Sequence, residues 1–206
     1  MRATFTLLLG LIFAGVVWSQ EAPMLPDNPF REELRQWPRV SDFYSRFLRA
    51  VGEPSLLVPP KLDGKRLFRF TWNRSMLHTI AVFRLEVSKD GTGVLTLRLA
   101  DAKTEPFTYE VYREVTKTLT KSQVVFLTQD FMMNRYIELV PFFPSIAADG
   151  EGWLFESNVD GYYTVKFRVS PEESVIRTIG RRFIDLFDEK DFQPNHSPEL
   201  APGAVH

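Results

Sequence analysis

The chain has no cysteine among its 206 residues. This absence excludes disulfide bonds, thiolate metal ligands, thiol nucleophiles and a lipid-modified cysteine. Small exported domains often depend on disulfides, but a chain of this length can bury a sufficient core without them. A cysteine-free chain with an export signal, described below, favours a bacterial periplasmic or secreted location.

Histidine is also scarce, and only His78 lies within the expected globular part, because His196 and His206 belong to a Pro-rich tail. A zinc site needs several His or Cys ligands, and a serine triad needs a His beside a nucleophile motif such as Gly-x-Ser-x-Gly, which this chain lacks. It also lacks a Gly-rich phosphate loop. The segment SIAADGEGWLFE matches an EF-hand only in part, since Ser145 and Ala147 stand where carboxylates are needed. We therefore expect no metal and no cofactor.

Charge shows no bias of sign, with 25 Lys and Arg against 26 Asp and Glu and a net charge of -1. A nucleic-acid or anionic-membrane partner is therefore not expected.

Long hydrophobic runs are missing as well. Residues 1–19 have an early Arg2, an apolar run from Leu7 to Trp18, and the small residues Val17 and Ser19 near their end, which is typical of a cleaved signal peptide. The alternative, a membrane anchor, needs roughly 20 apolar residues. No later segment is long enough, so the sequence predicts an exported soluble protein with no integral membrane segment after signal cleavage.

The remaining chain divides into three parts. Residues 20–40 form a Pro-rich arm, in which Asn28 is expected to cap a short helix. Residues 41–190 form one domain, and residues 191–206 form a tail without apolar periodicity that we expect to be disordered. Ser41 is the expected N-cap of the first helix of the domain, which ends near Gly52.

Alternating apolar residues predict strands over 66–72, 78–87, 94–100, 107–118, 152–157 and 162–169, and Asp90-Gly91 is a strong hairpin signal. Helical spacing predicts a helix capped by Thr120 and a last helix with Ile176, Ile179, Phe183 and Leu186 directed inward. The fold class is therefore α+β: a single domain with a twisted, mainly antiparallel sheet of about six strands and helices packed on one face.

Alternation also divides the sheet residues between two faces. Within 152–169 it assigns Trp153, Phe155, Tyr163, Val165 and Phe167 to the core. It predicts a polar face that carries Arg69, Arg84, Glu86, Arg98, Glu110, Tyr112, Glu114, Glu156, Tyr162, Lys166 and Arg168. This face is either a solvated surface with weak ion pairs or a recognition surface. The candidate binding residues are Arg84, Glu156, Tyr162 and Arg168.

One stretch also resembles a known sequence pattern. Asp149-Gly150, Trp153, Glu156, Gly161-Tyr162, Arg168, Ser170-Pro171 and then Gly180 resemble the pattern D-G-x-x-W-x-x-E, Y, R-x-S-P of small exported bacterial proteins of uncharacterised function. The resemblance implies export and fold, and it implies no activity.

These observations favour a non-enzymatic binding or interaction module that uses the charged sheet face to hold an unknown protein or polar ligand of the cell envelope. One alternative is a hydrolase acting on a polar envelope component such as a glycan, with Glu156 and a second strand carboxylate as acid and base. Another is a purely structural module without a discrete site.

Overall fold

A computed structural model describes residues 23–25, 37–59, 63–74, 79–103, 108–132, 142–143, 150–171 and 175–193. The predicted signal peptide, most of the arm, His78 and the tail beyond Gln193 lie outside these ranges.

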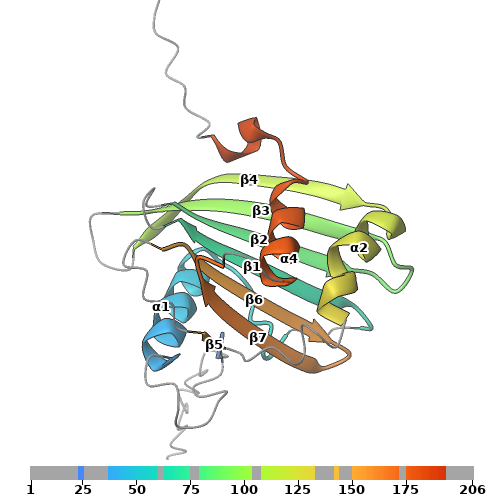
Figure 1. Cartoon of the computed structure of the whole chain (residues 1–206), viewed down its shortest axis with the longest axis horizontal. Coiled ribbons are helices and arrows are strands. Elements are labelled where there is room, and N and C mark those ends of the chain that lie inside the picture. The colour runs from blue at the N-terminus through green and yellow to red at the C-terminus, as the bar shows by residue number, and fades with distance from the viewer. Residues whose placement is uncertain are drawn as a thin grey trace, which may run out of the picture.

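The described residues form one open sheet with the strand order β4-β3-β2-β1-β6-β7-β5 (Figure 1). Six strands are antiparallel, and the two-residue β5 (Phe142–Phe143) pairs in parallel with β7. The six are β1 (Arg66–Arg74), β2 (Thr79–Val87), β3 (Gly93–Ala102), β4 (Tyr109–Leu119), β6 (Gly152–Val159) and β7 (Tyr162–Val169). The expected single-domain α+β class is confirmed.

Three α-helices and two short 3₁₀ segments accompany the sheet: α1 (Trp37–Ala50), α2 (Lys121–Thr128), η2 (Gln129–Met132), α4 (Val175–Ile184) and η3 (Glu189–Phe192). Figure 1 shows α2 and α4 in front of the same sheet face. The first helix begins at Trp37, so the expectation that Ser41 caps it is wrong. Pro38 is compatible with this earlier start, because proline is tolerated in the first turn of a helix. Thr120 does cap α2, through a capping box with Gln123.

Both faces of the sheet are covered. The α4 face carries the larger core, in which Phe70 stacks on Phe83 and Phe155 with ring centroids 5.3 and 4.5 Å apart. The opposite face, which we call the α1 face, packs Phe47 and Leu48 of α1 on apolar residues of β2 and β3. The sequence indicated the first of these layers, and the structure adds the second.

The second layer continues onto β7, where the sequence-based assignment of faces is wrong. Asp160-Gly161 forms a two-residue turn that pairs Val159 with Tyr162, and directly opposed residues share a face. Odd positions of β6 therefore share a face with even positions of β7. As a result Tyr163, Val165 and Phe167 pack on the α1 face, while Tyr162, Lys166 and Arg168 lie on the α4 face.

A second correction arises in β4. The pairing of β3 with β4 shifts between Leu99 and Ala100, where a β-bulge leaves Tyr112 without an opposed residue. The bulge reverses the faces beyond it. Tyr112 packs against the core of the α4 face, and Tyr109 packs against Phe47 on the α1 face. The predicted placement of Tyr112 and Glu110 on the same face as Arg98 is therefore wrong.

Helix α4 lies directly on Trp153. Its inward residues Ile176, Ile179 and Phe183 are fully buried, as predicted. Gly180 allows the close approach, because a Cβ atom at this position would stand 2.2 Å from Cζ3 of the Trp153 indole.

We expect Gly180→Ala to destabilise the protein. A methyl group forced against the indole costs on the order of 1–3 kcal/mol, whereas the higher helix propensity of alanine returns at most about 1 kcal/mol. Urea denaturation should show a net loss, and Val125→Ala, an exposed change on the neighbouring helix α2, should alter stability by no more than about 0.5 kcal/mol. Equal stability of the two variants would contradict the close packing.

Candidate functional site

The centre of the α1 face holds a buried ion pair between β1 and β6. The guanidinium of Arg69 donates from Nε and Nη2 to the two carboxylate oxygens of Glu156, each at 2.7 Å, and both side chains are fully buried. Tyr163 of β7 donates its hydroxyl to Oε1 of Glu156 at 2.9 Å. Burial by itself lowers the pKa of Arg69, but Glu156 and Glu53 outweigh that effect and raise it. The guanidinium of Arg69 therefore stays charged despite its burial.

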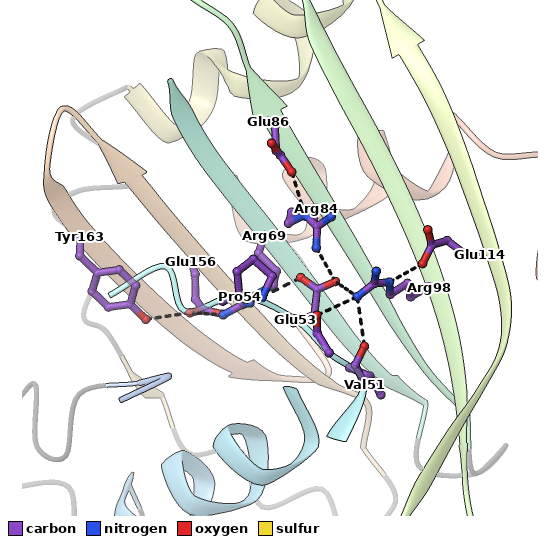
Figure 2. A network of polar contacts seen from close by, with 11 residues as sticks. Val51, Glu53, Pro54, Arg69, Arg84, Glu86, Arg98, Glu114, Glu156 and Tyr163 are labelled. Carbon is purple, nitrogen blue, oxygen red and sulfur yellow. Dashed lines mark hydrogen bonds and ion pairs between the residues drawn. The ribbon is translucent and has the colours of Figure 1, made fainter. Parts of the chain in front are cut away.

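A second carboxylate, Glu53, enters the same face from the segment that follows α1 (Figure 2). Its Oε1 accepts from Nη1 of Arg84 at 2.9 Å and from Nη1 of Arg98 at 3.1 Å, and its Oε2 lies 3.6 Å from Nη1 of Arg69. Gly52, with a φ of +70°, allows the chain to turn into the sheet directly after the helix. The three strands β1, β2 and β3 thus converge on one loop residue.

Backbone contacts secure this loop on the network. Nη1 of Arg98 also donates to the carbonyl oxygens of Val51 and Gly52, each at 3.1 Å, and Nη1 of Arg69 donates to the carbonyl of Pro54 at 2.8 Å. Carbonyl groups near the end of α1 carry partial negative charge, which a guanidinium offsets. We call the side chains of Arg69, Arg84, Arg98, Glu53 and Glu156 the charged network.

The charged network is therefore buried around Arg69 and does not form an open surface. Arg69, Glu53 and Glu156 have side chains with no exposed area, and those of Arg84 and Arg98 are 14% and 18% exposed. The chain's own Glu53 occupies the position that an external anion would take. The arrangement fixes the loop and α1 on the middle of the sheet.

The four candidate binding residues do not come together. Arg84 and Glu156 both belong to the charged network, but the described residues show no direct contact between the two. Tyr162 is 80% exposed at the tip of the β6–β7 hairpin, and it lies with Arg168 on the α4 face.

A polar cleft lies at the other end of this hairpin, beside α4. It has a volume of about 310 Å³ and is lined by Glu151, Trp153, Ser170, Pro171, Arg177 and Arg181. We call it the α4 cleft. The sequence singled out Trp153 and Ser170-Pro171 through their motif. It gave no role to Glu151, which only the hairpin register brings next to Ser170.

Glu151 is held in one orientation within the α4 cleft. Its Oε2 accepts from the indole Nε1 of Trp72 at 2.8 Å and from that of Trp153 at 3.1 Å. Its backbone N–H donates to Oγ of Ser170 at 3.0 Å, and the backbone N–H of Ser170 donates to its carbonyl oxygen at 2.8 Å. Ser170 has a φ of +41°, which is uncommon for a residue with a side chain and marks local backbone strain.

Arginines give this end of the α4 face a positive balance. Arg177 and Arg181 are exposed and stand one turn apart on α4, and Arg168 lies opposite Trp153 across the hairpin. Lys166, two residues away on the same face, is 6% exposed. Burial, with a further contribution from the charge of Arg168, lowers the pKa of Lys166 from 10.5 to about 8.

The described residues show no other chemical centre. They include no cluster of three or more His, Asp or Glu side chains suited to a metal ion, and none of their helices is long and apolar enough to cross a membrane. Two further clefts lie along α1; one is lined mostly by apolar side chains such as Val40, Phe43 and Phe167. No protein-family model matches the chain, and no curated protein matches it either.

Loss of one partner of the buried pair should be costly. Glu156→Ala leaves the guanidinium of Arg69 buried without its bidentate partner, and we expect the free energy of unfolding to fall by about 3–5 kcal/mol. The double variant Arg69→Met/Glu156→Leu should recover most of this loss, because it removes both charges. Glu86→Ala, which removes a 38% exposed partner of Arg84, should cost less than about 1 kcal/mol in urea denaturation. Similar losses in Glu86→Ala and Glu156→Ala would rule out this role of the pair.

The lowered pKa of Lys166 predicts a pH-dependent stability. Between about pH 8 and 10.5 the folded chain has lost a proton that the unfolded chain still binds, so stability contributed at this residue rises with pH in that window. Below pH 8 both states are protonated and the contribution is constant. The difference in free energy of unfolding between the wild type and Lys166→Met should therefore increase in favour of the wild type across the window. If the free energies of unfolding of the two proteins changed in parallel with pH, this role of Lys166 would be refuted.

Proposed function

We propose that the chain is an exported, non-enzymatic binding protein and that its ligand site is the α4 cleft. One observation carries the proposal: this hollow presents a fixed carboxylate and guanidinium groups to solvent together. Oε2 of Glu151 accepts hydrogen bonds from both indole groups, and the described residues donate none to its Oε1. The described residues offer the guanidinium of Arg181 neither a hydrogen bond nor an ion pair, and the side chain is exposed. A cleft of about 310 Å³ is of a size that small ligands occupy.

The site proposed here differs from the charged sheet face that the sequence favoured. A ligand at that face would have to displace Glu53 and break its contacts to Arg84 and Arg98 at 2.9 and 3.1 Å. Removing a carboxylate from a largely buried cluster of guanidinium groups costs several kcal/mol. The α4 cleft requires no such displacement.

The structure gives the alternative of a glycan hydrolase no support. A general acid must reach the bond that it protonates, but Glu156 has no exposed area and both of its oxygens accept hydrogen bonds. In the α4 cleft Glu151 is the one carboxylate among the described lining residues, whereas glycoside hydrolysis ordinarily uses two. Binding without chemistry is the role that this arrangement favours.

Export remains part of the proposal on the strength of the sequence. The apolar run from Leu7 to Trp18 and the small residues near its end are typical of a signal peptide, and the absence of cysteine fits a location outside the bacterial cytoplasm. A ligand of the cell envelope follows from that location.

The test is a thermal-shift assay with the fraction below 1 kDa of a bacterial envelope extract. We expect this fraction to raise the melting temperature of the wild type, because a ligand that binds only the folded state stabilises it. Arg181→Glu should abolish the shift by reversing a charge at the α4 cleft. Arg46→Ala, at an exposed position of α1 paired with Asp42, should keep it. Circular dichroism spectra should show both variants folded.

No shift in the wild type, or an equal shift in Arg181→Glu, would overturn the proposal. Either result would mean that the cleft holds no small envelope ligand.

A further inference from the structure

The α4 cleft offers two opposite kinds of recognition, a carboxylate and a cationic helix face, and these restrict the chemistry of its ligand. The inference below rests on the proposed function, since it concerns the same cleft.

The first element is an oriented acceptor. Two indole N–H groups hold Oε2 of Glu151, and the backbone of this residue is paired with Ser170 in both directions. With its conformation fixed, the carboxylate loses little freedom when a ligand donates to Oε1. The group opposite Oε1 must be a donor, such as an ammonium, amide or hydroxyl group.

The second element is cationic. Arg177 and Arg181 line the α4 cleft from one face of α4, where residues four apart are neighbours. A guanidinium group matches a carboxylate or another planar anion through paired hydrogen bonds. An anionic group is therefore favoured on the helix side of the cleft.

The two elements together exclude simpler ligands. An anion without a donor would gain from the arginines but would lie against the carboxylate of Glu151, which repels it. A neutral ligand would donate to Glu151 and leave the guanidinium of Arg181 without an anionic partner. The volume of about 310 Å³ further limits the ligand to a few tens of atoms at most.

We propose that the α4 cleft binds a small acid that carries an amino or hydroxyl donor beside its carboxylate, with the donor on Glu151 and the carboxylate on Arg181. Amino acids or peptide ends, and sugar acids, are the two sources of this chemistry in a cell envelope. The two sources differ in the group that donates a hydrogen bond to Glu151, which is an ammonium in the first case and a hydroxyl in the second.

The test is isothermal titration calorimetry of the full chain with L-serine, glycylglycine and glucuronate. Acetate serves as the acid without a donor, ethanolamine as the donor without an acid, and glucose as the neutral sugar. We expect either the two amino compounds or glucuronate to bind, and to bind at least about tenfold more tightly than acetate, ethanolamine and glucose. This ratio is the gain expected from one added charge-assisted hydrogen bond.

Two variants separate the two halves of the site. Arg181→Gln should weaken the binding of the preferred acid and of acetate alike, by about tenfold or more. Glu151→Gln keeps an oxygen for the indole donors, so the fold is preserved. This variant should weaken the binding of the preferred acid by a similar factor and leave the binding of acetate unchanged or tighter. Arg46→Ala should behave as the wild type with every compound.

Acetate binding as tightly as the preferred acid would overturn the inference and indicate a plain anion site. An affinity for the preferred acid that Glu151→Gln leaves unchanged would overturn the inference as well. If no compound of the panel binds while the envelope fraction still gives a shift that depends on Arg181, the proposed function stands and this ligand class is wrong. If that shift is also missing, both fail.

Discussion

The buried pair of Arg69 and Glu156 is the interaction on which the rest of the molecule depends. Both side chains leave water completely, and such a pair is tolerable only when its hydrogen bonds are satisfied. Tyr163, the carbonyl of Pro54 and the nearby carboxylate of Glu53 supply the contacts around it. A sheet face with three arginines in adjacent strands could not close over an apolar helix without this balance. The charged network is thus what allows α1 to cover the second face.

That closure decides where binding can occur. The charged residues with the strongest mutual contacts turn inward to hold the fold, and the polar groups that remain accessible lie at the open end of the β6–β7 hairpin. There Glu151 and Arg181 face a hollow that the described part of the chain does not fill. If the α4 cleft is the ligand site, as proposed, stability and recognition use different sets of charges on opposite faces of the same sheet.

The sequence predicts the local part of this structure well and the long-range part less well. Alternation correctly assigned Arg69 of β1, Arg84 of β2 and Arg98 of β3 to one face, and the Asp90-Gly91 turn was visible directly. Across Asp160-Gly161, however, apolar residues alternate in both strands, and only the turn length shows that opposite parities share a face. The bulge at Tyr112 leaves no comparable signal. Glu53 lies in a Pro-rich loop, and its role follows from contacts with Arg84 and Arg98, more than 30 positions away in the chain.

The geometry of the α4 cleft is in turn set by the core. One ring of Trp153 lies against Gly180 of α4, while the indole nitrogen of the same side chain donates to Glu151. Arg181 follows Gly180 directly in the helix. The backbone of α4 at Arg181 is therefore positioned relative to Glu151 through a single rigid indole, whose ring is packed between α4 and the stacked phenylalanines of β1 and β6. A shift of α4 on Trp153 would move the two recognition groups relative to each other, so packing at Gly180 and ligand selectivity at Glu151 are expected to change together.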